Sequence, residues 1–270
     1  AYSMHHTPTI EFLDHPGYHA AMERLKAEGR VKFSGVSYHG PSRSGQGNAA
    51  EVLTAAAEDG RFDMMLFVYN FMNSEQGDQI LAACKANDVG TTIMKSAPGV
   101  LHFDSFDPDN MTDEQKRFAE RYGLRTADQL RLGSIQWVLQ NPDAHTVCVS
   151  LNDFENIDRV VAVSGTRLSQ SDEEFLDRLA QSVNSQYCRH GCVECAHQCP
   201  YGVPVSRIMR YAYYFEVQGR EKHAMSRYAQ LAGSKGSACA DCSAPCDRAC
   251  PHGFQIRAQM SKAHSMLTLV

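Results

Sequence analysis

The sequence predicts an α/β protein in which a parallel sheet with flanking helices precedes a smaller, cysteine-rich domain. Three observations predict it. Short apolar runs alternate with helix-patterned segments over the first 165 residues, eight of the ten cysteines lie between Cys188 and Cys250, and the formal charge changes sign near residue 182. Residues 1–181 carry 16 Lys and Arg against 26 Asp and Glu, whereas residues 182–270 carry 10 against 5. We therefore expect two domains, 1–181 and 182–270.

The composition excludes several classes of protein. The chain has 270 residues, of which 43% are hydrophobic and 21% charged, and these are globular proportions. A formal net charge of −5 gives no indication of nucleic-acid binding. No run approaches the roughly 18 to 20 apolar residues of a transmembrane segment. We expect neither nucleic acid nor a membrane span.

The elements of the first domain follow from periodicity. Apolar runs of strand character cover residues 31–37, 62–69, 91–95 and 146–150. Helical spacing covers residues 18–28, 48–58, 80–86, 112–122, 130–139, 154–161 and 171–179. The segments Thr112-Asp-Glu-Gln115 and Ser171-Asp-Glu-Glu174 are capping boxes that predict two helix starts. Apolar strands, each followed by an amphipathic helix, are typical of parallel βαβ units.

Two architectures fit this alternation, an open doubly wound sheet and a (β/α)₈ barrel. A dinucleotide-binding doubly wound domain carries GxGxxG after its first strand, and a P-loop carries GxxxxGK followed by Ser or Thr. The chain contains neither pattern. The sequence therefore favours the TIM-type barrel.

The cysteines of the second domain form two runs of four. The first run is Cys188-x3-Cys192-x2-Cys195-x3-Cys199-Pro200, and the second is Cys239-x2-Cys242-x3-Cys246-x3-Cys250-Pro251. Three thiols in a short loop with a fourth before proline are typical of [4Fe–4S] clusters. Zinc would favour two CxxC pairs around a longer spacer, and disulfides would not crowd four cysteines into twelve residues. We predict two [4Fe–4S] clusters, with zinc and disulfides as the alternatives.

The pairing of cysteines with clusters is expected to be crossed. In ferredoxin-type pairs the fourth cysteine of one run binds the other cluster. Cys250 would then complete the first cluster and Cys199 the second. Local pairing remains the alternative, because the x3 spacings after Cys188 and Cys242 depart from the usual x2-x2-x3 run. The aromatic residues between the runs are expected to form core, since large aromatics dominate burial in small domains; they are Tyr211, Tyr213, Tyr214, Phe215 and Tyr228.

Several stretches of the first domain match one known family in order. They are Met4-His5-His6, the run EGRVKFSGVS that ends at Ser37, Tyr69-Asn70, Ile93-Met94-Lys95, and the run IQWVLQNP that ends at Pro142. With these stretches followed by two four-cysteine runs, the chain resembles the aldo/keto reductases, and among them the branch with a C-terminal ferredoxin-type domain.

The resemblance implies an active site at the carboxyl ends of barrel strands. It implies that His5 is catalytic and orients a small carbonyl substrate, and that Ser37, Asn70 and Lys95 contact NADP(H). The family's catalytic Asp, Tyr and Lys lie upstream of this histidine, on strands that this sequence does not contain. We therefore expect an incomplete (β/α)₈ barrel, with exposed edges that a longer sequence or another chain completes.

Some family contacts are replaced here. Tyr38 stands where the family has Asn, Leu66 where it has the Gln of the carboxamide site, and Asn152 and Val160 where its phosphate-binding end has Arg or Ser and Asn. Leucine removes both a donor and an acceptor, and without Arg a 2′-phosphate loses its bidentate partner. The sequence predicts weak NADPH binding.

Two functions follow from these observations. The first is an aldo/keto reductase-like oxidoreductase that couples carbonyl and alcohol chemistry to electron transfer through two clusters. The second is a non-catalytic iron–sulfur subunit with a degenerate barrel. Both imply a protein electron-transfer partner, since clusters exchange single electrons, and reduced thiolate clusters favour a cytoplasmic location. Outside the runs, Cys84 and Cys148 are expected to be buried structural thiols.

Overall fold

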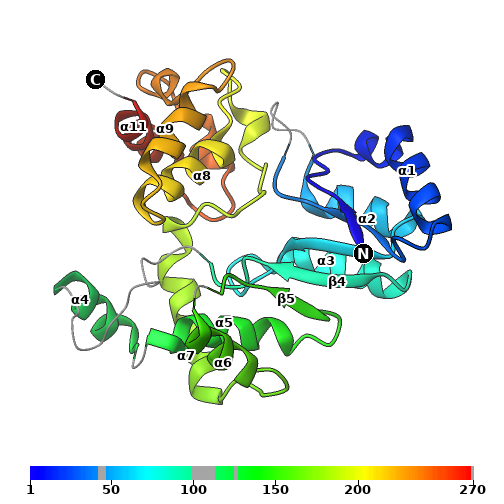
Figure 1. Ribbon diagram of the computed structural model, residues 1–270. Coiled ribbons are helices and arrows are strands. Elements are labelled where there is room, and N and C mark those ends of the chain that lie inside the picture. Colours follow the sequence, from blue (N-terminus) through cyan, green and yellow to red (C-terminus); the bar gives the residue numbers. More distant parts are fainter. Residues whose placement is uncertain (42–46, 99–112, 125–126, 152, 269–270) are drawn as a thin grey trace. The chain divides into compact units, whose positions relative to one another are not determined.

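The computed structural model describes all residues except 42–46, 99–112, 125–126, 152 and 269–270 (Figure 1). The chain divides into two compact units. The α/β unit comprises Ala1–His39 and Ala49–Ser182, and the cysteine-rich unit comprises Gly40–Asn48 and Val183–Val270. None of the described helices combines the length and the apolar character that a membrane span requires.

The α/β unit is built on one parallel sheet whose strands follow the order of the chain, β1-β2-β3-β4-β5. The strands are β1 (Tyr2–Met4), β2 (Ser34–Ser37), β3 (Met64–Val68), β4 (Gly90–Met94) and β5 (Thr146–Cys148). A doubly wound sheet reverses its strand order at a switch point, whereas a TIM barrel adds each strand beside the last. The described strands therefore have barrel-type winding, as expected, in an open sheet of five.

The strands are shorter than the apolar runs that predict them. Pairing of β2 begins at Ser34, although the run begins at Val31. Asp63 sets this start, since its carboxylate accepts hydrogen bonds from the Ser34 backbone N–H at 2.7 Å and from the Ser34 hydroxyl at 3.0 Å. The apolar residues thus show which part of the chain is buried. The length of the strand is shorter, because it depends on where the backbone pairs with the neighbouring strands.

Each α-helix described in the α/β unit overlaps a predicted segment, whereas the short helix over residues 10–14 is not predicted and the third α-helix begins five residues before residue 80. Contacts join α2 to α3, α3 to β3 and β4, and α5 to β5. The helices are η1 (Ile10–Asp14), α1 (Pro16–Ala27), α2 (Ala49–Glu58), α3 (Glu75–Ala86), α4 (Asp113–Tyr122), α5 (Ala127–Leu139), α6 (Phe154–Ala162) and α7 (Gln170–Val183).

One predicted helix start is wrong by two residues. Helix α7 begins at Gln170, so its cap is Ser169 and not Ser171. The Ser169 hydroxyl accepts from the Asp172 N–H at 3.2 Å and donates to the Asp172 carboxylate at 2.6 Å. Ser169 therefore caps α7 by accepting from the N–H three residues on, and the Asp172 carboxylate holds the Ser169 hydroxyl in place. The predicted box at Thr112 lies outside the described residues.

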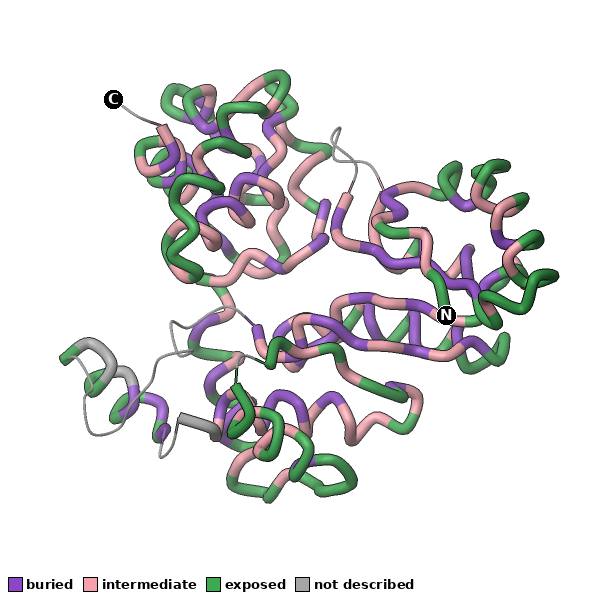
Figure 2. Tube along the Cα trace, viewed as in Figure 1, coloured by how far each residue is buried: buried purple, intermediate pink, exposed green. Residues whose placement is uncertain are grey.

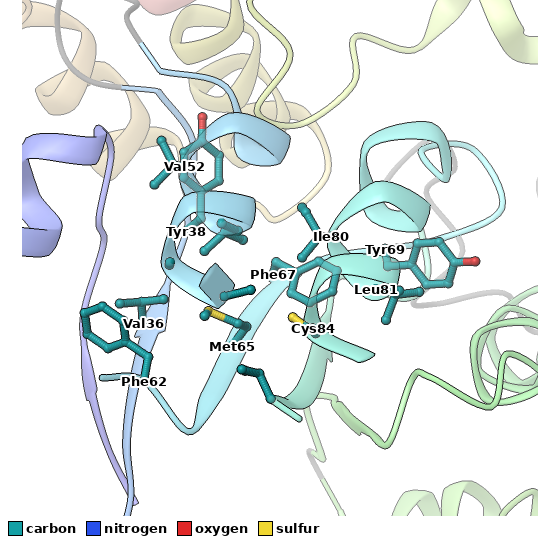
Figure 3. Close-up of a cluster of buried hydrophobic side chains, with 14 of the residues drawn as sticks. Val36, Tyr38, Val52, Phe62, Met65, Phe67, Tyr69, Ile80, Leu81 and Cys84 are labelled. Carbon is teal, nitrogen blue, oxygen red and sulfur yellow. The ribbon is translucent and has the colours of Figure 1, made fainter. Parts of the chain in front are cut away.

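The core of the α/β unit lies between the sheet and helices α2 and α3 (Figure 3). Val36, Met65, Phe67 and Ile93 are completely buried. Gly77 permits the close approach of α3, since a Cβ there would lie 2.3 Å from Cδ2 of Tyr69. Burial of each large apolar side chain contributes about 1.5–3 kcal/mol, so this layer holds the strand ends in place.

The fifth strand and the helix after it are poorly covered (Figure 2). Helix α6 has no buried residue, and its Phe154 is 87% exposed. Cys148 in β5 is exposed, so the expectation of a buried thiol is wrong there, whereas Cys84 in α3 is buried as expected. Burial raises the pKa of the Cys84 thiol to about 12.

The cysteine-rich unit is a set of short helices around a second core. Buried Ile208, Ala224, Tyr228 and Met260 lie at its centre. The expected core role is confirmed for Tyr211 and Tyr228, whereas the other three aromatics are half-buried. The helices are η3 (Asn184–Gln186), η4 (Ala196–Gln198), α8 (Val205–Glu216), α9 (Glu221–Ala229), η5 (Gly236–Cys239), α10 (Pro245–Ala249) and α11 (Ile256–Leu267).

Candidate functional site

The eight clustered cysteines lie in two segments that contact each other. The first segment carries Cys195 just before η4, and the second carries Cys246 inside α10. Helix α10 packs against η4. Cys239 and Cys246 belong to the core of the unit. Four others border it, namely Cys188, Cys195, Cys199 and Cys250, and Cys242 is buried. The packing therefore brings the two runs together.

Electrostatic interactions divide these cysteines into two sets. Burial, and after it the charges of Cys192, Cys195 and Cys250, raises the pKa of the Cys188 thiol. We call these four cysteines the first set. Burial, and after it the charges of Cys199, Cys246 and Cys242, raises the pKa of the Cys239 thiol to about 11.

Cys239 and these three partners form the second set. Each set thus takes its fourth member from the other run, with Cys250 in the first and Cys199 in the second. Cys195 also interacts with Cys246, so the two sets adjoin. This grouping is the crossed one.

Backbone N–H groups point at the sulfurs. The Val203 N–H donates to Sγ of Cys199 at 3.3 Å, and the Ala244 N–H donates to Sγ of Cys242 at 3.4 Å. Ala244 has a left-handed backbone with φ of 54°, which is a strained conformation for a residue with a Cβ. Such donors stabilise thiolates, since a charged sulfur accepts hydrogen bonds better than a thiol does.

The residues present fit a cubane cluster. Four gathered thiols resist ionisation by mutual repulsion unless positive charge binds among them, and metal binding removes their protons. Among the described residues, no three His, Cys, Asp or Glu side chains are arranged to hold one metal ion. A [4Fe–4S] cluster makes no such demand, because each of its four thiolates binds a separate iron.

A second group of polar side chains lies at the carboxyl ends of the strands of the α/β unit. The rings of His5 and His39 lie 4.5 Å apart between centroids, and the His6 ring lies 6.2 Å from His39. Burial, and then the charges of Lys95, His5 and His6, lowers the pKa of His39 to about 4. His39 is therefore a neutral imidazole at pH 7, with Nε2 buried and without a hydrogen-bond partner among the described residues.

Backbone strain is concentrated at the same place. His6 and Lys95 have φ values of 60° and 54°, in the left-handed region that favours glycine. Strained residues of this kind cost of order 1 kcal/mol each and are frequent at functional sites. The strain supports the strand ends as the candidate active site of this unit.

Two of the predicted cofactor contacts are engaged within the protein. Asn70 is completely buried, its amide donates to the Lys95 carbonyl at 2.9 Å, and its Oδ1 accepts from the Met72 N–H at 3.0 Å. Ser37 is also buried, and its hydroxyl accepts from the His6 N–H at 3.0 Å. The Ser37 hydroxyl lies 3.5 Å from Nδ1 of His5. These groups hold the strand ends in place.

The described residues do not fit NADP(H) well. Asn70 is completely buried and already bonds the backbone through its amide N–H and its Oδ1, and the Leu66 side chain has neither a donor nor an acceptor. Val160 is apolar, and Asn152 lies outside the described residues. Arg131 lies near this end of the sheet, where its guanidinium donates to the Ser150 carbonyl and to Asn156, both at 2.7 Å. We derive no step through the nucleotide.

Two residues that the structure places at the candidate sites, His39 and Arg189, are not among the site residues predicted from the sequence. His39 is part of the strand-end group only because β2 pairs beside β1. The signal that could have found it is its position two residues after Ser37, at a strand end. Arg189 is only 5% exposed and interacts with Cys188, Cys192 and Cys250. Its signal is its position inside the first cysteine run.

Comparison with known proteins gives a likeness in structure but none in sequence, since no family model and no curated protein matches the chain. The chain is similar to the holo form of an aldo-keto reductase from Bacillus halodurans, with 16% identity, a TM-score of 0.47, and coverage of 66% of this chain and 57% of that one. It is also similar to an aldo-keto reductase from Klebsiella pneumoniae in complex with NADPH, with 20% identity, a TM-score of 0.41, and coverage of 66% and 57%.

A third similar structure is the glycerol dehydrogenase from Gluconobacter oxydans, with 16% identity, a TM-score of 0.43, and coverage of 67% and 58%. The chain therefore spans between 57% and 58% of the length of these three proteins. At such identities and TM-scores the likeness establishes no family, and we assign no activity from it.

Proposed function

We propose that the chain is an iron–sulfur oxidoreductase in which the cysteine-rich unit binds two [4Fe–4S] clusters. The observation that carries the proposal is the crossed grouping, in which Cys250 joins the first run and Cys199 joins the second. Crossing is the ferredoxin pattern, and it places two clusters next to each other. Each cluster supplies the exchange of one electron with an external donor or acceptor.

The chain's own residues create the conditions for this exchange. The contact between α10 and η4 holds the two sets side by side, and Cys195 of the first set interacts electrostatically with Cys246 of the second. The N–H groups of Val203 and Ala244 stabilise sulfur charge in the second set. The excess of basic residues in 182–270 offsets the negative charge of thiolate-bound clusters and favours an acidic electron-transfer partner.

We propose that the strand ends of the α/β unit bind a small carbonyl or alcohol. Reduction of a carbonyl to an alcohol takes two electrons and two protons. Two clusters match the electron count, with the electrons coming from the external protein donor. The two protons come from water through His5, and the neutral ring of His39, 4.5 Å away between centroids, positions the His5 ring. Carbonyl reduction is the chemistry of the aldo/keto reductases that the chain resembles. The proposed reaction differs in that it does not require their hydride donor, NADP(H).

The non-catalytic alternative has one specific observation in its favour. Asn70 and Ser37 are buried and bonded within the protein, so two of the predicted ligand contacts serve the fold. In that case the α/β unit only positions an electron-transfer module. We also propose that further polypeptide, from a longer sequence or another chain, covers the exposed strand and helix at β5 and α6.

Metal analysis tests the central proposal. We expect about eight irons and eight sulfides per chain after anaerobic preparation, with a broad visible absorbance that dithionite bleaches. The matched control is Cys148→Ser, since Cys148 is exposed and lies outside both sets. This variant should keep all of the iron. One or two zinc ions with no sulfide would contradict the proposal.

Reoxidation separates the two forms of the proposal. We expect dithionite-reduced protein, freed of excess reductant, to regain its absorbance when a small aldehyde is added without oxygen. The corresponding alcohol is the control and should have no effect. His5→Ala and His39→Ala should slow the reoxidation while keeping the iron. Equal rates in all three proteins would favour the non-catalytic subunit.

A further inference from the structure

One surface of the cysteine-rich unit combines aromatic rings with positive charges. In α8 the Arg210 guanidinium lies 4.9 Å from the centre of the Tyr213 ring and 5.8 Å from that of the Tyr214 ring. The Arg220 guanidinium lies 5.5 Å from the centre of the Tyr214 ring, and the His223 ring lies 5.8 Å from it. We call these five residues the arginine–tyrosine surface.

The side chains of this surface are accessible and held in place. Arg220 and His223 are exposed, whereas Arg210, Tyr213 and Tyr214 are half-buried. Contact with a ring restricts a guanidinium before any partner binds, so less side-chain entropy is lost on binding. Tyr and Arg are also enriched among the residues that dominate binding at protein–protein interfaces. The surface therefore has the composition and the order of a docking site.

The positive charges of this surface are not neutralised within the unit. Among the described residues, neither Arg210 nor Arg220 forms an ion pair with a carboxylate. Glu216 lies in the same helix as Arg210, but it pairs with Lys262 at 2.6 Å. Over residues 187–223, five Arg and Lys stand against three Glu, one of which is this paired Glu216. The excess positive charge favours a partner whose surface carries carboxylates.

A hydrogen bond joins this surface to the loop of the first set. His190 lies between Cys188 and Cys192 in the chain, and Nε of Arg210 donates to its Nδ1 at 3.0 Å. A protein that binds at Arg210 therefore lies next to the loop that carries two cysteines of the first set. Electron transfer between two proteins requires that their redox centres come close together.

We propose that the arginine–tyrosine surface is the docking site of an acidic electron-transfer protein, which exchanges one electron with the first cluster. The inference rests on the proposed function, since it requires that cluster. Carboxylates of the partner pair with Arg210 and Arg220, and its apolar atoms cover the two tyrosine rings. One electron passes between the partner's redox centre and the first cluster, and no covalent bond is made or broken.

Calorimetry tests the proposal on the full chain with both clusters, titrated at low salt with a plant-type [2Fe–2S] ferredoxin of net negative charge. We expect Arg220→Gln to weaken binding at least threefold, and Arg210→Gln combined with Arg220→Gln to weaken it at least tenfold. The matched control is Arg248→Gln, since Arg248 is exposed and lies in α10 beside the second set. It should change the affinity less than twofold. Higher salt should weaken binding of the unmodified chain and reduce these differences.

Carbodiimide crosslinking locates the bound ferredoxin, because it joins carboxylates to lysine amines. Lys222 is exposed and lies between Arg220 and His223 in the chain. We expect the crosslinked peptide to contain Lys222. The other lysines of the unit, Lys235 and Lys262, are the internal controls and should not be crosslinked to the ferredoxin.

Three results would overturn the inference alone, provided that the proteins keep eight irons. They are no binding of the ferredoxin, equal weakening by Arg220→Gln and Arg248→Gln, and crosslinks at Lys235 or Lys262 in place of Lys222. Arg220 has no described contact with the first cysteine run, so its variant remains informative if Arg210→Gln loses a cluster. Unmodified protein without iron and sulfide would instead overturn the proposed function.

Discussion

The two units differ in how their sites are assembled. The eight clustered cysteines lie in two short stretches of sequence, so spacing alone identifies them. The structure is needed only to show how they group. The strand-end site brings together His5, His39 and Lys95 from β1, β2 and β4. Ligands that lie close together in the sequence therefore identify a site without a structure. Residues at the ends of different parallel strands identify one only when the order of the strands in the sheet is known.

The largest expected effect tests the grouping of the cysteines. Cys199→Ser should remove the cluster of the second set and about half of the iron, while the cluster of the first set persists. Site-resolved EPR and iron analysis would measure this. Loss of the first cluster with a retained second one would show that each run binds its own cluster.

The next effect tests whether the two units are independent. A Cβ at Gly35 would lie 2.5 Å from Cγ and 2.6 Å from the carbonyl oxygen of Met64 in the sheet. We expect Gly35→Ala to lower the free energy of unfolding of the α/β unit by about 1–3 kcal/mol and to keep the iron. Urea unfolding followed at Trp137, the single tryptophan, would measure it.

The matched variant lies in the cysteine-rich unit. A Cβ at Gly236 would lie 2.6 Å from the Met260 carbonyl oxygen, at the start of the helix η5 that ends at Cys239. Gly236→Ala should displace that helix and release iron, with little change in the Trp137 transition. If both variants shift the Trp137 transition equally, the comparison between independent units fails.

A smaller effect concerns nucleotide binding at the strand ends. We expect NADPH to bind weakly, because two lost hydrogen bonds at about 1 kcal/mol each weaken binding roughly thirtyfold. Leu66→Gln restores a donor and an acceptor and should strengthen binding severalfold in calorimetry. Low-micromolar binding by the unmodified chain would show that other residues take over these contacts.

The smallest effect is a pH dependence from His39. Its pKa is lowered to about 4 in the fold against 6.5 ordinarily, so between these values only the unfolded chain takes up the proton. The free energy of unfolding should therefore fall as pH falls from 6.5 toward 4. His39→Gln should flatten this dependence in urea titrations at pH 7 and pH 5; an unchanged slope would contradict it.

Periodicity was sufficient for the order and type of the elements but not for their ends. The strand β2 starts at Ser34 because Asp63 binds there, and α7 starts after Ser169, because a carboxylate of Asp completes its cap. Both are contacts between specific side chains and backbone groups. Apolar spacing does not encode such contacts, so boundaries remain uncertain by a few residues.

The candidate sites show the same limit. The cysteines were predicted as ligands by type and spacing, whereas His39 and Arg189 were missed, since a single His or Arg carries no spacing signal. Asn70 was predicted to contact a cofactor, and the structure gives its amide a second use in holding the Lys95 backbone. Residue type predicts what a side chain can bind, and only the fold shows what it does bind.

The crossed grouping also affects the order in which the cysteines become available during translation. Cys188, Cys192 and Cys195 leave the ribosome before their fourth partner, because 55 residues separate Cys195 from Cys250. At bacterial and eukaryotic elongation rates this interval lasts roughly 3 to 11 s. During it three thiols wait without a complete ligand set and are open to oxidation and to other metals. Under the proposed function, cluster delivery follows translation of the second run, and the first run needs protection until then.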